Sequence, residues 1–340
     1  MDIILSQRVQ KIKPSPTLAV AQKAAQLRSE GKDVIGLGTG EPDFDTPEHI
    51  KQAAIRALQE GHTKYTAVDG IAPLKQAICD KFKNDNQLSY DPSQVLVSVG
   101  GKQSIFNLTQ AFLNEGDEVI IPAPYWVSYP DIALLAGATP IIINTTIEDE
   151  FKITAEQVEA AITPKTKLMF FNSPSNPSGK AYSLNELKAI GEVLLRHPHV
   201  LIATDDMYEH IIWSEDGFHN ILNATPELYD RTLVLNGVSK AYAMTGWRIG
   251  YAAGPQKLIA AMKKIQSQST SNPCSIAQYA ALEALTGPQD DVKTMLNAFK
   301  TRHDFVYERL GNMKGVKVIP SEGTFYIFPD FSEAIKTKGY

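Results

Sequence analysis

Two cationic residues, Lys240 and Arg248, could do chemistry together because of where they lie in the chain. A short apolar run at 232–235 predicts a buried strand, which leads directly into Ser239 and Lys240. Burial at such a strand end lowers the pKa of a lysine and leaves its amine free to react with an aldehyde. Arg248 follows eight residues later, and its planar guanidinium can grip a phosphate through paired hydrogen bonds.

A ligand with both an aldehyde and a phosphate fits this pair, and pyridoxal 5'-phosphate (PLP) is such a ligand. The alternative is an ordinary surface: a lysine whose amine reaches solvent at a strand end, and an arginine in an ion pair. Lys240 and Arg248 alone do not distinguish these two interpretations, so the choice depends on the rest of the chain.

Strands and helices alternate from residue 94 to residue 237, which predicts an α/β fold with a mostly parallel sheet covered on both faces. Ligands of such sheets bind beyond the carboxyl ends of the strands. Candidate binding residues follow five predicted strands at this edge: Gly100-Gly101, Trp126, Asn176, Asp205 and Lys240. Independent surface positions would not line up in this way, so the pattern favours one ligand site.

Several of these positions have a chemical rationale of their own. Gly100-Gly101 precedes a predicted helix whose free amides attract an anion, and Lys102 adds a cation there. Asp205 ends a buried strand, where a carboxylate needs a cationic partner. Trp126 could stack on a flat ring, although it could equally belong to the core.

Composition excludes several classes of protein. The 340 residues carry a net charge of -5, which gives no basic surface for nucleic acid or for a polybasic membrane contact. No apolar run approaches the roughly 20 residues of a membrane helix. The start of the chain, with Asp2 and only a three-residue apolar run, is not a signal peptide. Two cysteines, Cys79 and Cys274, are too few for a disulfide framework, so we expect a cytoplasmic protein.

The chain is long enough for two domains. We expect an N-terminal segment (1–45), with a helix at 8–31 and a strand at 34–35, that packs with a smaller α+β domain at 286–340. The latter is predicted to contain a long helix and short strands at 316–319 and 325–328. Residues 46–285 form the large, three-layer domain that would bind PLP.

Longer motifs resemble the class I PLP-dependent aminotransferases of fold type I, in the bacterial and plant-type aspartate (aspartate/prephenate) aminotransferase subgroup. The resemblance covers essentially the whole sequence and depends on these motifs: GTGEPDFDTP, KYTAVDG, GGKQSIFNL, PYWVSYP, NSPSNPSG, DDMYEH and SKAYAMTGWRIGY. It implies transfer of an amino group between an amino acid and a 2-oxo acid by a homodimer with shared active sites, and it implies no metal.

The resemblance also implies how residues contact the ring of the cofactor. Lys240 would form the Schiff base with PLP and then act as the general acid and base. Asp205 would pair with the pyridinium nitrogen and keep it protonated, so that the ring withdraws electrons. Tyr208 and Asn176 would hydrogen-bond the ring oxygen, and Trp126 would stack on the ring.

Other residues would hold the phosphate. By the same resemblance, Arg248, Gly101, Lys102 and Ser239 would surround it in one chain. Tyr65 would reach the phosphate of the neighbouring subunit, which is the reason to expect a two-fold dimer.

The implied substrate contacts are Gly38, beside the α-carboxylate, together with Trp126 and Asn176. Lys102 resembles the group that recognises the distal carboxylate of a dicarboxylic substrate. That favours aspartate and glutamate with oxaloacetate and 2-oxoglutarate, and some relatives with this lysine also accept prephenate. The alternative is that Lys102 only balances the charge of the phosphate.

One family feature has no counterpart in this sequence. The family places an arginine for the substrate α-carboxylate well after the 320–326 region, whereas this sequence ends at Tyr340 without such a motif. We expect the sequence to be a fragment of a longer protein rather than a truncated, inactive form.

Two other functions are compatible with a PLP site. A β-eliminating lyase of the same fold would share Lys240, Asp205 and Arg248, but NSPSNPSG and GGKQ favour the aminotransferase. A non-catalytic PLP-binding regulator would carry an added DNA-binding segment, and residues 1–30 are too short and not basic enough for one.

Overall fold

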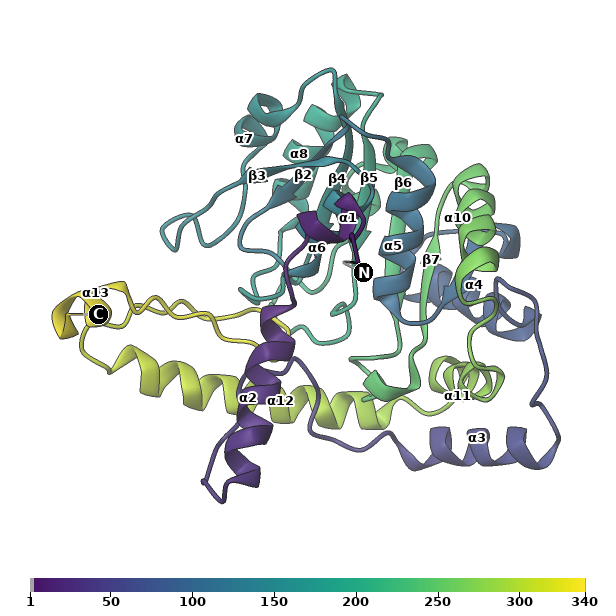
Figure 1. The fold of residues 1–340 in the computed structure, drawn as a ribbon, viewed down its shortest axis with the longest axis horizontal. Coiled ribbons are helices and arrows are strands. Elements are labelled where there is room, and N and C mark those ends of the chain that lie inside the picture. The colour runs from purple at the N-terminus through teal and green to yellow at the C-terminus, as the bar shows by residue number, and fades with distance from the viewer. Residues whose placement is uncertain (1–2, 340) are drawn as a thin grey trace.

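A computed structural model describes residues 3–339, so Asp2 and Tyr340 lie outside the described residues. Its centre is a seven-stranded sheet in the order β1-β7-β6-β5-β4-β2-β3 (Figure 1). The strands are β1 Val95–Ser98, β2 Glu118–Pro122, β3 Thr139–Ile143, β4 Thr166–Asn172, β5 Leu201–Asp205, β6 Thr232–Gly237 and β7 Gly250–Ala253. Strand β7 runs antiparallel to β1 and β6, and the other neighbouring pairs are parallel. The prediction of a mostly parallel α/β sheet is therefore confirmed, although β7 was not predicted.

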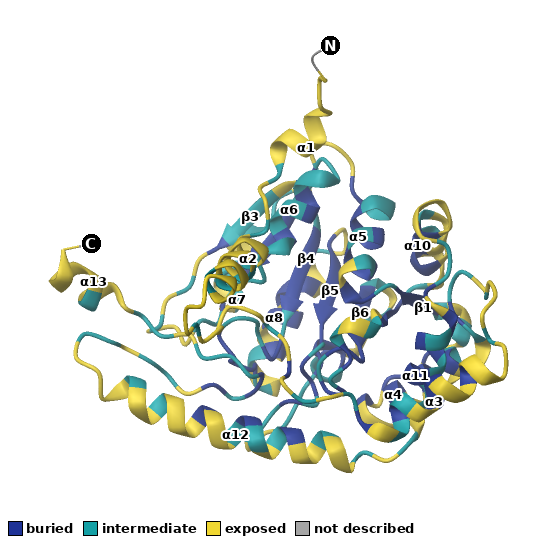
Figure 2. Ribbon diagram, turned by 60° about the horizontal axis from the view of Figure 1, so that its bottom comes forward, coloured by how far each residue is buried: buried dark blue, intermediate teal, exposed yellow. Residues whose placement is uncertain are grey.

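Helices cover both faces of the sheet and make three layers (Figure 1). One face is covered by α5 Gly101–Phe112, α6 Ser128–Leu135 and α10 Gln256–Ser269. The opposite face is covered by α4 Ala72–Asn86, α7 Ala155–Ala161, α8 Leu184–Arg196, α9 Ile221–Ala224 and α11 Ser275–Thr286, with α3 Glu48–Gln59 packed on α11. Strand side chains alternate between the layers: Val119 and Ile121 join one core cluster, and Ile120 joins the other. The central strands are accordingly almost wholly buried, whereas the edge strand β3 is mostly of intermediate exposure (Figure 2).

Further helices precede and follow the part of the chain that forms the sheet. The N-terminal segment forms α1 Gln7–Lys11 and α2 Pro16–Ser29, and the C-terminal part forms α12 Asp290–Gly311 and α13 Ser332–Lys338. The helix predicted at 8–31 is present but divided into α1 and α2, because Pro14 and Pro16 follow α1 and proline lacks the amide proton that a helix interior needs. No helix within residues 3–339 is long and apolar enough to cross a membrane.

The strands predicted at 34–35, 316–319 and 325–328 are also absent from the described residues. Of these residues only Lys317 forms an isolated bridge, to Asp330, and a second isolated bridge nearby joins Ile212 to Gly323. An extended segment needs a neighbouring strand to complete a ladder, and these segments have none. The domain boundaries proposed at 45 and 285 remain predictions.

The segment 321–326, which follows the bridge-forming residue Lys317, is attached to the large part of the molecule by main-chain hydrogen bonds. The amides of Glu322 and Gly323 donate to Gly179 O at 2.8 and 3.0 Å, and the amide of Trp213 donates to Glu322 O at 2.8 Å. A small apolar cluster joins the same parts: Tyr208 and Ile211 pack with Met295 and Phe299 of α12, and Phe325 and Tyr326 lie against them. This segment therefore forms one wall of the space above the sheet.

Candidate active site

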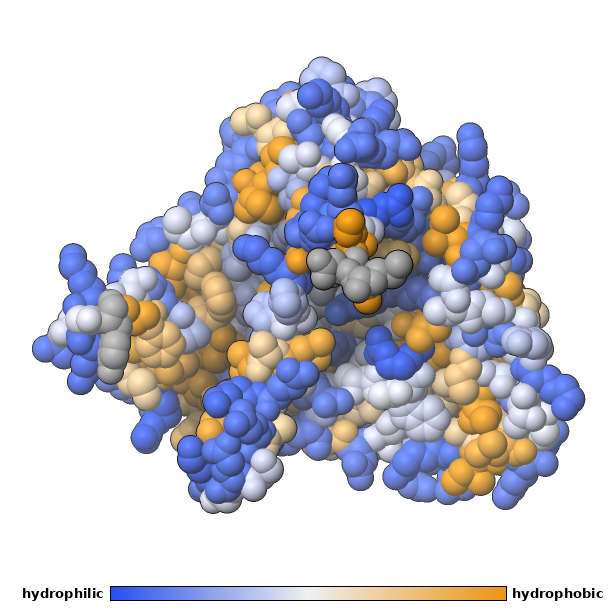
Figure 3. Space-filling model, viewed as in Figure 1, coloured by the Kyte–Doolittle hydropathy of each residue, from blue (hydrophilic) through white to orange (hydrophobic). Residues whose placement is uncertain are grey.

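A cavity of about 810 Å³ lies beyond the carboxyl ends of the strands, between them, the N-terminal segment and α12. The surface is hollowed between α1 and α2 on the face seen in Figure 3. The cavity is lined by all of the predicted site residues except Tyr65: Gly38, Gly101, Lys102, Trp126, Asn176, Asp205, Tyr208, Ser239, Lys240 and Arg248. The fold thus brings together residues that lie far apart in the sequence.

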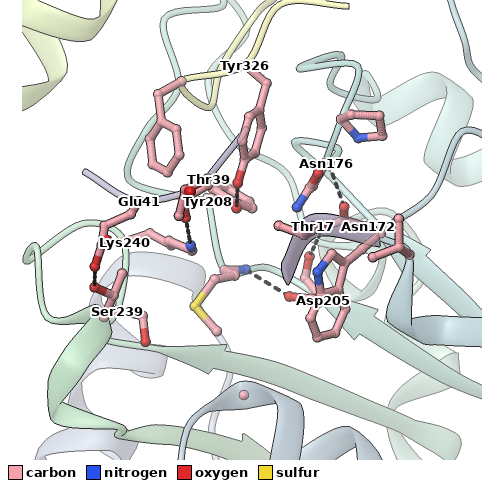
Figure 4. A pocket seen from close by; sticks show the side chains of 18 of the residues that line it. Thr17, Thr39, Glu41, Asn172, Asn176, Asp205, Tyr208, Ser239, Lys240 and Tyr326 are labelled. Atoms are coloured by element: carbon pink, nitrogen blue, oxygen red, sulfur yellow. Dashed lines mark hydrogen bonds between the residues drawn. The ribbon is translucent and has the colours of Figure 1, made fainter. Parts of the chain in front are cut away.

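Lys240 follows β6 and extends into the cavity, where its Nζ donates a hydrogen bond to Gly40 O (Figure 4). Burial lowers the pKa of Lys240 to about 8, the Glu41 carboxylate opposes this shift and the Arg248 guanidinium adds to it. A lysine with this pKa is partly unprotonated near neutral pH. Lys240 can therefore act as a nucleophile toward a carbonyl group and as a proton acceptor.

Asp205 is the last residue of β5 and lines the cavity. It and Lys240 lie on opposite sides of Tyr208 (Figure 4). Its Oδ2 accepts a hydrogen bond of 2.7 Å from Tyr129 Oη, and its Oδ1 accepts one of 3.3 Å from the Met207 amide. Burial raises the pKa of Asp205, while these two donors and the charge of Lys240 act against that shift. Asp205 is suited to bind a cationic N–H group of a ligand, which would hold the carboxylate in its charged form.

Asn172, the last residue of β4, fixes the loop that carries Asn176. Its Nδ2 donates to Asp205 O at 2.7 Å, and its Oδ1 accepts from the Asn176 amide at 2.7 Å. Asn176 is thereby held next to the end of β5, with its side chain among the residues that line the cavity.

An anion site lies at the start of α5. Gly101 is the first residue of the helix, and Gly100 before it has a φ of +80°, which favours glycine. A Cβ on Gly100 would overlap the Arg248 guanidinium, so the missing side chain lets the cation lie beside the free amides. Arg248 Nη1 donates to Thr245 O at 2.7 Å, which orients the guanidinium. These groups suit a phosphate.

Lys102 lies on the same side of the cavity, with its Nζ 4.8 Å from the ring centroid of Trp126. Burial, with a smaller contribution from Arg248, lowers the pKa of Lys102. Its ammonium and the indole ring form a cation–π pair at the entrance to the anion site. Lys102 can therefore bind either the same anion as Arg248 or a second negative group beside Trp126.

Several site residues were not predicted from the sequence. Tyr129 belongs to helix α6 and reaches Asp205 from a neighbouring layer, and Tyr326 contacts Tyr208 from the 321–326 segment, with 2.7 Å between the two hydroxyls. The signal for Tyr129 was its place in the motif PYWVSYP, three residues after Trp126. Arg302 of α12 also lines the cavity, but its Nη1 pairs with Asp43 Oδ1 at 2.7 Å.

Tyr65 does not line the cavity of its own chain. It lies in the loop between α3 and α4 and is 92% exposed, which is exceptional for a tyrosine. Whether Tyr65 contributes to a site in another copy of the chain therefore stays a prediction.

The chain was compared with known proteins. Residues 32–338 match the family model described as aminotransferase class I and II. The aspartate/prephenate aminotransferase of Nitrosomonas europaea is 62% identical over 331 residues, which are 97% of this chain and 83% of that protein. An aspartate aminotransferase of Geobacillus stearothermophilus is 50% identical over 98% of this chain and 85% of its own length.

Solved structures are also similar. The aspartate aminotransferase of Rhizobium meliloti has a TM-score of 0.94 at 49% identity. The alignment covers 98% of this chain and 83% of that structure. The Thermus thermophilus enzyme solved with maleate has a TM-score of 0.93 at 44% identity, with 97% and 85% of the two chains covered. Together with the lysine, carboxylate and anion site in one cavity, these likenesses establish that the chain belongs to the class I and II aminotransferase family.

Proposed function

We propose that the protein binds PLP in this cavity and transfers the amino group of aspartate or glutamate to a 2-oxo acid. The observation that carries the proposal is the position of Lys240, a lysine with a lowered pKa, across the cavity from the buried carboxylate of Asp205. A reactive amine, an acceptor for a pyridinium and a cationic anion site are the three features that PLP requires.

The residues present fit the cofactor. The amides at the start of α5, Arg248 and Ser239 would hold its phosphate, Asp205 its ring nitrogen and Tyr208 its ring oxygen. Trp126 would cover one face of the ring. When bound, PLP supplies an aldehyde that takes up an amino group and a ring that withdraws electrons from the carbon losing a proton.

The residues of the chain would then orient the substrate and move its proton. Lys240 Nζ can take the proton from the substrate α-carbon, since its lowered pKa leaves part of the amine unprotonated. Asp205 would keep the ring nitrogen charged, because an ionised carboxylate stabilises a cation across a short hydrogen bond. The N-terminal segment, with Gly38 and Gly40 at the cavity wall, would exclude water.

Lys102 is the residue proposed to select a dicarboxylic substrate. It lies beside Trp126 in the lining of the cavity, and its ammonium can bind a second carboxylate. The relative from N. europaea is named for both aspartate and prephenate, and the T. thermophilus structure contains maleate, a dicarboxylate. Prephenate, a 2-oxo acid with a further carboxylate, is therefore proposed as an additional acceptor.

We further propose a homodimer in which Tyr65 of one copy completes the phosphate site of the other. The high exposure of Tyr65 supports this, because a large aromatic side chain is seldom left in water without a partner.

Following the amino group with a ¹⁵N label tests the proposed reaction. PLP-loaded protein is incubated with ¹⁵N-labelled L-aspartate and 2-oxoglutarate, and the products are identified by mass spectrometry. The proposal predicts ¹⁵N-glutamate and oxaloacetate, with no product from the Lys240→Ala variant. No labelled glutamate from aspartate, together with release of ¹⁵N-ammonia and pyruvate from a ¹⁵N-labelled amino acid that carries a thiolate leaving group on its β-carbon, would instead indicate a β-eliminating lyase and would refute the proposal.

A further inference from the structure

Tyr208 and Tyr326 form a hydrogen-bonded phenol pair inside the cavity. Their hydroxyl oxygens are 2.7 Å apart and their rings meet edge to face, at 72° with centroids separated by 5.6 Å. Tyr208 is 3% exposed, and Tyr326 approaches it from the 321–326 segment (Figure 4). The pair lies between Lys240 on one side and Asp205 on the other.

Both phenols keep their protons near neutral pH. Burial raises the pKa of Tyr326 to about 12 and raises the pKa of Tyr208 well above its usual value. The other titratable groups that face Tyr208 are Asp205, Tyr129 and Lys240, whose Nζ lies 5.9 Å from the centroid of the Tyr208 ring. Two hydroxyl protons are therefore available, and the bond between the phenols uses one of them.

Which phenol donates depends on what else binds. A hydroxyl has one proton and two lone pairs, so Tyr208 cannot donate to Tyr326 and to a ligand at the same time. When Tyr208 gives its proton to a ligand oxygen, Tyr326 has to donate to Tyr208. A donor that itself accepts a hydrogen bond becomes a stronger donor, because the two bonds polarise each other.

Tyr326 is held in place from several sides. Ser321 Oγ donates to Tyr326 O at 3.0 Å, and the Tyr326 amide donates to Thr324 Oγ1 at 3.1 Å. A Cβ on Gly40 would overlap the Tyr326 hydroxyl, so a glycine at this position admits the phenol. The oxygen of Gly40 also accepts the hydrogen bond from Lys240. Tyr326 therefore touches both the loop that holds Lys240 and the residue expected to contact the cofactor.

We infer that Tyr326 is a positioning residue that donates its hydroxyl to Tyr208 and thereby strengthens the hydrogen bond from Tyr208 to the ring oxygen of the cofactor. The inference rests on the proposed PLP site. It gives the 321–326 segment a part in the chemistry, because the segment carries the group that polarises Tyr208.

Visible absorption of the PLP-loaded protein as a function of pH tests this inference. The absorption of PLP bound to a lysine changes as the proton shared with the ring oxygen dissociates. A donor to that oxygen stabilises the deprotonated form and lowers the spectroscopic pKa. A hydrogen bond to a charged group contributes about 1.5–3 kcal/mol, or roughly 1–2 pKa units, so Tyr208→Phe raises this pKa by about one unit or more. Tyr326→Phe raises it by about 0.3 unit, in line with the strengthening expected from cooperativity.

The same variants show whether Tyr326 acts through Tyr208. In the Tyr208→Phe background, the added Tyr326→Phe change is expected to leave the spectroscopic pKa unchanged, since the donor that it polarises is gone. Tyr242→Phe is the matched control: Tyr242 is also buried, with its hydroxyl bonded to Gln289 Oε1 at 3.0 Å outside the cavity. The PLP-loaded Tyr242→Phe variant should have the same spectroscopic pKa as the wild type.

The outcomes separate the inference from the proposed function. If the PLP-loaded wild-type protein lacks the absorption band of lysine-bound PLP, the proposed PLP site is overturned and the inference with it. A normal wild-type titration with an unchanged pKa in Tyr326→Phe, or an equal shift with and without the Tyr208 hydroxyl, would overturn the inference alone. If Tyr326→Phe does not fold, Gly40→Ala replaces it, because the added methyl displaces the Tyr326 hydroxyl and predicts the same upward shift.

Discussion

Asp205 can bind a cationic ligand group because two donors already point at its oxygens. The Tyr129 hydroxyl and the Met207 amide stabilise the carboxylate in a place where burial alone favours the neutral acid. Tyr129 is the stronger of the two by geometry, at 2.7 Å against 3.3 Å. The charge on Asp205, and with it the affinity for PLP, should depend on Tyr129.

Tyr129→Phe is therefore expected to weaken PLP binding by about tenfold or more, since a hydrogen bond to a charged group contributes about 1.5–3 kcal/mol. The dissociation constant is measured by titrating apoprotein with PLP and following absorbance. Tyr90→Phe is the control, because Tyr90 is also buried but its hydroxyl has no hydrogen-bond partner among the described residues. Equal affinities for the two variants would contradict the assignment.

Burial of Lys240 makes its amine reactive, but it also lowers the stability of the folded protein at neutral pH. Its pKa falls from 10.5 in the unfolded chain to about 8 in the folded one. Between these values the unfolded chain binds a proton that the folded chain has lost, so stability rises with pH across this window. At pH 7 both forms are largely protonated, and the folded protein carries the cost of burying the charge.

Lys240→Met apoprotein should accordingly be more stable than wild type at pH 7, by about 1–3 kcal/mol. The difference should shrink as the pH rises from 8 to 10.5 and nearly vanish above it. Urea denaturation at a series of pH values measures this, with Lys257→Met at an exposed lysine of α10 as the control. If the free energies of unfolding of Lys240→Met and wild type differ by the same amount at all pH values, the pKa of Lys240 is not lowered by burial in the folded protein.

Alternating strands and helices made much of the site predictable. Trp126, Asn176 and Lys240 each follow a strand and Asp205 ends one. Parallel strands end at the same edge of a sheet, so the convergence of these residues required only the order of elements. The glycine pair at the start of α5 was predictable for the same reason, because a helix that starts at that edge directs its free amides into the cavity.

Other contacts were not predictable because they depend on how layers pack. Tyr129 lies in the first turn of α6, and no local pattern specifies which strand a helical tyrosine will reach. Tyr326 lies in a segment that looks like a strand in sequence but stays extended without a ladder, held by Gly179 and Trp213. Strand propensity reports how well a residue fits a sheet, and it does not report whether a partner strand exists.

The turn after β5 is held by a buried polar cluster that joins three elements. Glu209 pairs with Lys81 of α4, and its two oxygens accept 2.7 Å hydrogen bonds from Asn236 of β6 and Asn86 of α4. Burial acts to raise the pKa of Glu209, but the Lys81 charge and these bonds outweigh it and lower the pKa to about 2. The cluster fixes the turn that carries Asp205 and Tyr208.

Glu209→Gln should destabilise the protein by about 3–5 kcal/mol, because it leaves the Lys81 ammonium buried without its counter-charge. The double variant Lys81→Met, Glu209→Leu removes both charges and should be less destabilised than Glu209→Gln. Thermal and urea denaturation measure the free energies of unfolding. A loss below 1 kcal/mol for Glu209→Gln would mean that Lys81 finds another partner or that water enters the cluster.

The cavity is closed by parts of the chain that come from both ends. The loop from Gly36 to Asp43 and the helix α12 meet over the strand ends, where Asp43 pairs with Arg302. Apolar residues near the N-terminus remain in water in a single copy: Ile3, Ile4 and Leu5 are 84%, 92% and 59% exposed, and Tyr65 is 92% exposed. Such exposure supports the proposed association of two copies.

Shared sites predict recovery of activity when an inactive variant is mixed with a weakened one. Lys240→Ala disables the site of its own chain, and Tyr65→Ala weakens the site of its partner, so a mixed dimer retains one site with both residues intact. Refolding the two variants together in equal amounts should give about a quarter of the wild-type activity, because half of the dimers are mixed and each has one complete site. Each variant refolded alone is the control, and a mixture no more active than their average would contradict the sharing of sites.

The most direct test is the visible absorption spectrum of PLP-loaded protein before and after addition of L-aspartate, without any 2-oxo acid. If Lys240 holds PLP and the protein is an aminotransferase for dicarboxylic amino acids, the band of the lysine-bound cofactor is replaced by that of pyridoxamine phosphate, and 2-oxoglutarate restores it. A lysine-bound band that does not respond to aspartate or glutamate would contradict the proposed reaction, and the absence of any such band would contradict the Lys240 site itself.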